Sequence, residues 1–193
     1  MRPLGGPGQG AYARPVRHLA LSALGRDRPG SVAAVTRVLL RHGMNVQDSQ
    51  MTILSGHFAM VLLVAGEDSL DVVRLRDDLE RVARDLELEA VSLSEVADAG
   101  GAHPEPTHIA AVYGADHPGI VHAAASAVAA HECNITDLTT RLSEGDGAED
   151  LYVVMMEIAA PADRVEGLRG ALEAVGRDEG VEVSLNELDR DEL

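Results

Sequence analysis

Apolar and polar residues alternate with two different periods along this chain. Residues 18–24 and 88–96 place an apolar side chain at every second position, which is typical of a strand with one buried face. Residues 30–41 bring Val32, Val35 and Leu39 to one side of a helix, and residues 69–86 form a longer amphipathic helix. Between these helices, the β-branched runs 45–54 and 57–64 are joined by Ser55-Gly56, which predicts a hairpin. The first half therefore has the element order β-α-β-β-α-β.

The same order of elements returns in the second half. We expect strands at residues 107–113, 134–143, 151–159 and 181–188, and helices at residues 119–131 and 162–175. A β-α-β-β-α-β unit is the ferredoxin-like plan, in which two helices cover one face of a four-stranded antiparallel sheet. The predicted fold class is α+β, with two ferredoxin-like domains in tandem.

Two short sequence patterns recur 89 residues apart and in the same order. Residues 25–32 (GRDRPGSV) correspond to residues 114–121 (GADHPGIV), and Asn45 and Asn134 each lie 18 residues after the aspartate of their own copy. We infer the duplication of one small domain. We predict domain 1 at residues 17–97, a linker at 98–106 and domain 2 at 107–190. Residues 1–16 are rich in Gly and Pro without periodicity, which predicts a disordered leader.

The chain is strongly acidic, with a net charge of −16, and the acidity is concentrated in its second half. Residues 107–193 hold 5 Arg against 18 acids. Such a surface repels a phosphate backbone, and aromatic residues for stacking on bases are only 2% of the chain, so we expect no direct nucleic-acid binding. No apolar stretch reaches 18 residues, and no secretion signal opens the sequence, so we expect no membrane span and a cytoplasmic protein.

The repeated Asp-x-Pro-Gly pattern has a chemistry of its own. It lies between the first strand and the first helix of each copy, where glycine allows close approach and the helix start offers free N–H groups to a carboxylate. Asp27 or Asp116 beside it can accept hydrogen bonds from an ammonium, and the amide of Asn45 or Asn134 both donates and accepts. Together these groups match an α-amino acid zwitterion. The alternative is purely structural, since Asp often caps a helix and Pro-Gly often marks a turn.

These motifs resemble the ACT domain, and the tandem arrangement resembles the glycine cleavage system transcriptional repressor family. The resemblance rests on Gly-x-Asp-Arg/His-Pro-Gly followed by a helix and then by Asn-Val or Asn-Ile, and it covers about residues 18–190. It implies a regulatory module that binds amino acids where ACT units meet, commonly side by side in a continuous sheet. It also implies a homodimer and a protein partner such as a transcription regulator or an enzyme.

The candidate ligand-binding residues follow from the repeated motifs and from this resemblance. They are Asp27, Arg28, Pro29, Gly30, Ser31, Asn45 and Val46 in the first copy, and Asp116, His117, Pro118, Gly119, Ile120, Asn134 and Ile135 in the second. Two departures from the family pattern stand out. Ser31 replaces an aliphatic residue, and Glu132 replaces the glycine that ends the first helix, where a left-handed Glu costs about 1 kcal/mol.

We predict no catalytic residue, no metal site and no cofactor. The histidines His117, His122 and His131 do not fall on one helical face, and Cys133 is matched by Met44 in the first copy, so no nucleophile is shared. The predicted function is a non-catalytic amino-acid sensor that signals through protein contacts. The alternative is an adaptor with the same fold that binds partners but no ligand.

Overall fold

The computed structural model describes residues 16–96, 104–143 and 151–188, and the chain divides into two units between Gly101 and Ala102. The elements of the first unit are β1 (Val16–Arg26), α1 (Ser31–Arg41), β2 (Asn45–Leu54), β3 (His57–Glu67), α2 (Val72–Asp85) and β4 (Leu88–Glu95). Those of the second are β5 (His108–Ala115), α3 (Ile120–Ala130), β6 (Asn134–Ser143), β7 (Leu151–Ala159), α4 (Val165–Glu179) and β8 (Glu182–Glu187).

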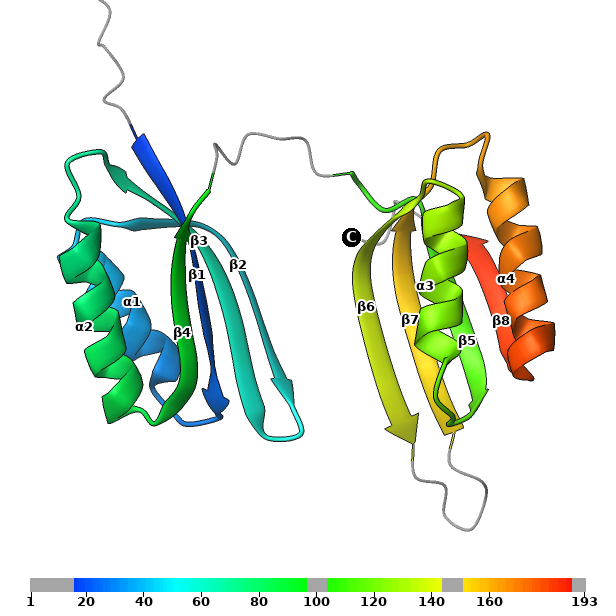
Figure 1. Cartoon of the computed structure of the whole chain (residues 1–193), viewed down its shortest axis with the longest axis horizontal. Coiled ribbons are helices and arrows are strands. Elements are labelled where there is room, and N and C mark those ends of the chain that lie inside the picture. The colour runs from blue at the N-terminus through cyan, green and yellow to red at the C-terminus, as the bar shows by residue number, and fades with distance from the viewer. Residues whose placement is uncertain (1–15, 97–103, 144–150, 189–193) are drawn as a thin grey trace, which may run out of the picture. The chain divides into compact units, whose positions relative to one another are not determined.

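Each unit is a four-stranded antiparallel sheet with two helices on one face (Figure 1). The strand orders are β2-β3-β1-β4 and β6-β7-β5-β8, so the first and third strands lie in the centre of each sheet. The predicted α+β class with two ferredoxin-like domains is therefore confirmed. No helix in the described part of the chain is long and apolar enough to cross a lipid bilayer.

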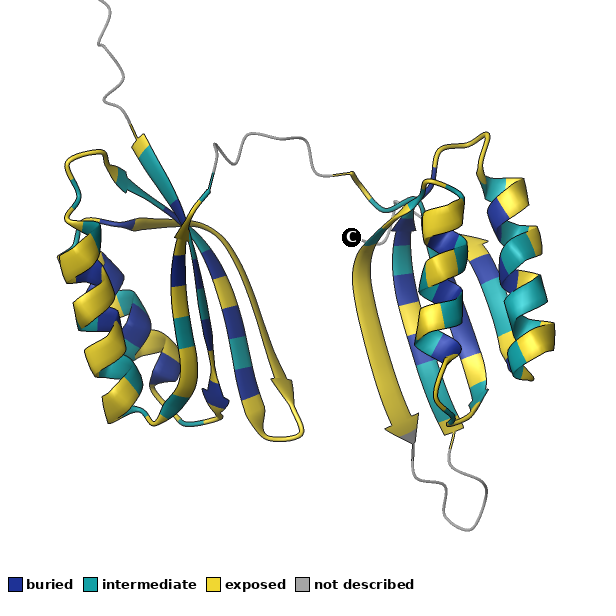
Figure 2. Cartoon of the chain, viewed as in Figure 1, coloured by how far each residue is buried: buried dark blue, intermediate teal, exposed yellow. Residues whose placement is uncertain are grey.

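Alternation along the central strands directs apolar side chains under the helices. In the first unit Leu19 and Leu21 of β1 pack with Leu75 and Leu79 of α2, and each is at most 2% exposed. In the second unit the core is formed by β5, β7 and both helices, and its largest fully buried side chains are Ile120, Met156, Ile158, Leu168 and Leu172. The strands β2 and β6 lie at the sheet edges, and they are exposed along nearly their whole described length (Figure 2).

The predicted turn between β2 and β3 is present, whereas the last helix begins and ends later than predicted. Ser55 and Gly56 have φ values of 49° and 79°, and they form the predicted two-residue turn between β2 and β3. The last helix, predicted at 162–175, instead spans Val165–Glu179 and ends at the left-handed Gly180. Gly176 lies inside this helix, and a Cβ there would lie 2.9 Å from the carbonyl oxygen of Val181, so glycine leaves room for the chain that follows the helix.

The predicted leader lies almost wholly outside the described residues, although Val16 already belongs to β1. Most of the predicted linker, the loop 144–150 and the last residues of the predicted second domain also lie outside them. The domain boundaries at residues 17, 97, 107 and 190 therefore stay predictions.

Candidate functional site

The two loops that carry the repeated Asp-x-Pro-Gly pattern have the same backbone form. We call residues 27–31 the first Pro-Gly loop and residues 116–120 the second. Gly30 and Gly119 are the N-caps of α1 and α3, with φ values of 94° and 118°, a region that glycine adopts without steric cost. Neither helix has a side-chain cap. In α1 the N–H of Ser31 donates to the carbonyl of Arg28 at 3.3 Å. The first-turn N–H groups of both helices have no capping side chain, which is a condition for anion binding at a helix start.

Hydrogen bonds and an ion pair hold the first Pro-Gly loop in place on its domain. The N–H of Asp27 donates to the carbonyl of Gly56 at 3.0 Å, which ties the loop to the tip of the β2–β3 hairpin. Arg28 forms an ion pair with Glu87 at the end of α2. The hydroxyl of Ser31 is buried and donates to the carbonyl of Arg28 at 2.9 Å. Ser31 thus closes the loop on itself, which is a structural use of the residue that departs from the family pattern.

In the second Pro-Gly loop, His117 takes the place of Arg28 and links the loop to Glu179, the last residue of α4. One ring nitrogen of His117 lies 3.3 Å from the carbonyl oxygen of Pro118, and the other lies 2.9 Å from that of Glu179. Two carbonyl acceptors favour the ring with both nitrogens protonated. The contacts with the Pro118 and Glu179 carbonyls, assisted by the Glu179 carboxylate, therefore raise the pKa of His117.

A hollow of about 320 Å³ opens beside the second Pro-Gly loop. It is lined by Asp116, His117, Pro118, Gly119, Ile120, Val121, His122 and Tyr152. Five of these were predicted from the sequence, while Val121, His122 and Tyr152 were not. Val121 and His122 follow the second Pro-Gly loop directly, on the opening turn of α3. This position in the sequence could have identified them as lining residues. Tyr152 comes from β7, where it pairs with Gly114, just as Phe58 pairs with Gly25 in the first domain.

The candidate asparagines open the second strand of each domain. Asn45 pairs with Ala65 and Asn134 with Ala159, and a register shift follows at the equivalent place in both strands. The preceding left-handed residues are Gly43 with a φ of 68° and Glu132 with a φ of 53°. The sequence predicted this left-handed Glu, and the left-handed backbone at Glu132 does not displace Asn134. The next residues, Val46 and Ile135, are exposed and half-buried, respectively.

The structure does not bring the asparagine and the Pro-Gly loop of one domain together. In the first domain Asn45 pairs with Ala65, while Asp27 follows Arg26, which pairs with His57 at the other end of β3. Eight positions of β3 separate those pairs, which corresponds to about 26 Å. The second domain repeats this geometry. A cradle formed by both elements within one copy, as the sequence analysis expected, is thus wrong, because α1 and α3 carry the chain back along the full length of the sheet.

The histidines and the cysteine contribute structural contacts. His131 bonds the carbonyl of Ala127 at 2.8 Å, and His42 lies 2.9 Å from a carboxylate oxygen of Asp78, which joins α1 to α2. Burial raises the pKa of the Cys133 thiol, which lowers its reactivity. Within the described residues, no group of three or more His, Cys, Asp or Glu side chains is placed to hold a metal ion.

Comparison with known proteins gives both halves the same assignment. A family model described as the ACT domain matches residues 17–92 and again residues 107–186. The glycine cleavage system transcriptional repressor of Escherichia coli (strain K12) is 25% identical over 175 residues, which cover 88% of this chain and 89% of that protein. A UPF0237 protein of Methanopyrus kandleri is 36% identical over 72 residues, 37% of this chain and 80% of that protein. The crystal structure of an unknown protein from Galdieria sulphuraria has a TM-score of 0.76 and 25% identity, covering 91% of this chain and all of that one.

Proposed function

Since the chain belongs to the ACT domain family, we propose that it is a non-catalytic regulatory protein that binds a free amino acid and signals through protein contacts. The observation that carries this proposal is the repetition of one anion-binding backbone form. Both domains open their first helix with a left-handed glycine, which has no side-chain cap and lies three residues after an aspartate.

The groups around the second Pro-Gly loop fit the two charges of an amino acid. N–H groups at the start of α3 suit the carboxylate, and the carboxylate of Asp116 suits the ammonium. The hollow of about 320 Å³ lies at the small end of the range of ligand pockets, which agrees with a ligand of a few heavy atoms. Of the two loops, the second is the stronger candidate, because Tyr152 and His122 also line the hollow beside it.

The asparagines fit the proposal if the ligand lies between two copies of the protein. β6 is an edge strand, and edge strands pair readily with another chain. In an antiparallel pair of β6 strands, the Asn134 end of one copy lies beside the Ser143 end of the other. Ser143 pairs with Leu151, which also pairs with Ala115, directly before Asp116. In such a pair, Asn134 of one copy lies near the second Pro-Gly loop of the other copy, although the two are far apart within a single copy.

A ligand held in this way transmits its signal by favouring the associated form over the separate one, which is a population shift. The partner that receives this signal is a transcription regulator or an enzyme of amino-acid metabolism. Because one relative is named as a glycine cleavage system transcriptional repressor, glycine is the first ligand to test. Glycine has five heavy atoms, so a ceiling of about 1.5 kcal/mol per atom limits its dissociation constant to several micromolar or weaker.

A second candidate function is an adaptor without a ligand. It is favoured by the exposed apolar side chains of β2, where Met51, Ile53 and Leu54 are 47%, 49% and 64% exposed. Exposed apolar residues on an unpaired edge strand are typical of protein interaction surfaces. This function needs no small molecule, so a ligand screen separates the two candidates.

The screen measures the melting temperature of the whole chain with each free amino acid at millimolar concentration. A ligand that binds only the folded state at 100 times its dissociation constant stabilises it by about 2.7 kcal/mol. Calorimetric titration of the best ligand then compares the wild type with Asp116→Ala and Asn134→Ala, which should abolish binding to the second domain. The matched variants Asp27→Ala and Asn45→Ala report the first domain. Wild-type affinity in all four variants would show that the site is elsewhere, and no response to any amino acid would favour the adaptor.

A further inference from the structure

The first domain has a cationic hollow where the end of α1 meets the start of α2. His42, directly after α1, lies 2.9 Å from a carboxylate oxygen of Asp78 in α2, so these two helix ends lie side by side (Figure 1). A hollow of about 390 Å³ opens there, and it is lined by Arg41, His42, Arg74 and Asp78. We call this hollow, together with the exposed side chains of the same helix ends, the helix-end surface; those side chains are Arg37, Leu40 and Val73.

The helix-end surface exposes two large apolar side chains. Leu40 and Val73 are 75% and 70% exposed, and no other large apolar side chain in the described part of the chain is exposed as far. Each of them is followed in the sequence by an arginine that lines the hollow, Arg41 or Arg74. Apolar side chains beside arginines are typical of surfaces that bind another protein.

The arginines of the helix-end surface have no structural partner. Within the described residues, no ion pair or side-chain hydrogen bond involves the guanidinium groups of Arg37, Arg41 and Arg74. The carboxylate of Asp78 in the hollow is already held by His42 and by Arg81, whose guanidinium lies 2.8 Å away. Asp78 therefore does not neutralise the three arginines, and their charges are available to an acidic partner.

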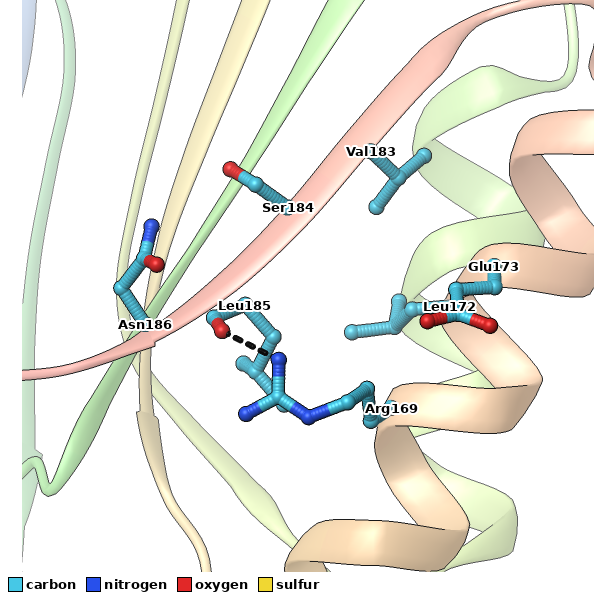
Figure 3. Close-up of a pocket in the computed structure, with 7 residues that line it drawn as sticks. All are labelled: Arg169, Leu172, Glu173, Val183, Ser184, Leu185 and Asn186. Atoms are coloured by element: carbon cyan, nitrogen blue, oxygen red, sulfur yellow. Dashed lines mark hydrogen bonds between the residues drawn. The ribbon is translucent and has the colours of Figure 1, made fainter.

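Another arginine of the second helix does have a structural role, and it has the same role in both domains. Arg76 of α2 donates to the carbonyl of Leu93 in β4 at 2.9 Å. Arg169 of α4 donates in the same way to the carbonyl of Leu185 in β8 at 2.7 Å, as Figure 3 shows. The fold thus retains an arginine that bonds the last strand, and the two bonds align α2 with α4 residue by residue.

The second domain lacks the helix-end surface. In this alignment and in the repeat of 89 residues, the positions of Leu40, Arg41, Val73 and Arg74 hold Ala129, Ala130, Glu166 and Gly167. The ring of His131 lies against Gly167, where a Cβ would lie 3.1 Å from its Cδ2 atom. In addition, α3 carries no Arg, Asp or Glu, whereas α1 carries two arginines and no acid. Because both domains have the same fold, the fold does not require the cations and exposed apolar side chains of the first.

We propose that the helix-end surface docks an acidic, amphipathic segment of a partner protein. Carboxylates of the segment bind Arg41 and Arg74, and its apolar side chains cover Leu40 and Val73. Charge complementarity selects this occupant, because nucleic acid is repelled by a chain with a net charge of −16, and a small anion would leave both apolar side chains in water. The surface lies about 15 Å along α1 from the first Pro-Gly loop, so the partner does not compete with a ligand there.

Fluorescence anisotropy with a labelled acidic peptide and the full chain tests the proposal. The peptide has about four helical turns and is built from Glu, Leu and Ala, with Leu on one face and Glu beside it. We expect saturable binding in the micromolar range. Arg41→Glu/Arg74→Glu and Leu40→Ser/Val73→Ser should each weaken it by about tenfold or more, because one variant reverses the two charges and the other removes the apolar contact.

The matched control is Arg84→Glu/Arg177→Glu, which changes the net charge equally at exposed positions outside the helix-end surface. It should bind the peptide within about twofold of the wild type, because long-range charge alone contributes little at physiological salt. A control that loses as much affinity as Arg41→Glu/Arg74→Glu would show that net charge, and not this surface, holds the peptide. Melting temperatures of all variants confirm that each remains folded.

A peptide with Ser in place of Leu, and inorganic phosphate added at constant ionic strength, separate docking from small-anion binding. The Ser peptide should bind about tenfold more weakly, and phosphate should not displace the Leu peptide. The opposite results would make the hollow a small-anion site and reject the proposal, as would a wild type that does not bind the peptide. The inference rests on the proposed function for the existence of a protein partner. Because the assay contains no free amino acid, its failure is distinguishable from failure of ligand binding.

Discussion

The ends of the first helices offer a direct test of backbone strain, because the two copies solve the same turn with different residues. Gly43 and Glu132 have left-handed φ values of 68° and 53°. In both copies the next N–H reaches back to the helix, from Met44 to Leu39 at 2.9 Å and from Cys133 to Val128 at 3.2 Å. The backbone is therefore the same, and only the side chain differs. A residue with a Cβ pays about 1–2 kcal/mol for this conformation, whereas glycine does not.

We expect Glu132→Gly to stabilise the second domain, once the loss of an ion pair is taken into account. The Glu132 carboxylate lies 2.8 Å from a guanidinium nitrogen of Arg164, but the two side chains are 74% and 45% exposed. Such a surface pair contributes at most about 1 kcal/mol. Glu132→Gln removes the charge and keeps the Cβ, so it is the proper reference. Relative to it, Glu132→Gly should be more stable by about 1 kcal/mol, which raises the melting temperature of a domain of this size by about 4–8 °C.

Differential scanning calorimetry of the full chain, supported by urea unfolding, measures the effect. The reciprocal change Gly43→Ala should destabilise the first domain by about 1 kcal/mol. A Cβ at Gly43 would meet no atom within 4 Å, so any loss there reports conformation and not a clash. Equal stability of the Gly and Gln variants at position 132, or a neutral Gly43→Ala, would refute the strain argument for both helix ends.

Two further predictions concern the loops beside the candidate site. His117 has a folded-state pKa raised above its ordinary value of 6.5, so its contribution to stability is complete below about pH 6.5 and is lost as the pH rises through the folded value. His117→Gln should remove this pH dependence from urea unfolding between pH 5 and 8, and an unchanged pH profile would exclude His117 as its source. Gly25→Ala should cost about 1–3 kcal/mol, because the new Cβ would lie 2.9 Å from the backbone Cα of Leu88. A wild-type urea midpoint would show that β4 moves aside freely.

Much of the fold followed from local patterns in the sequence. The switch between periods of two and of about 3.6 residues indicated the order of strands and helices in the described residues, although the last helix begins and ends later than predicted. Burial of one face imposes that spacing on each element. Ser55-Gly56 indicated its turn, since few residues adopt left-handed backbone without cost. The pairing of Phe58 and Tyr152 with equivalent glycines confirmed that the two copies share one register.

The candidate site was predicted less completely, because it depends on contacts between distant segments. The sequence identified both Pro-Gly loops and both asparagines, but it placed them together within one copy. Tyr152 joins the hollow only through its pairing in the sheet, and His117 meets Glu179 across 62 residues of chain. The spacing of residues along the chain therefore could not predict these two contacts.

The sequence by itself determined two copies of a β-α-β-β-α-β domain, each with a Pro-Gly loop that opens its first helix, because periodicity and turn chemistry act between near neighbours. Only the tertiary structure decided which ends of the elements meet. The antiparallel sheet carries Asn134 about 26 Å from the loop that contains Asp116, and it leaves β6 at an edge. Strand order and register are set by packing of the whole core, and so no pattern between near neighbours in the sequence contains them.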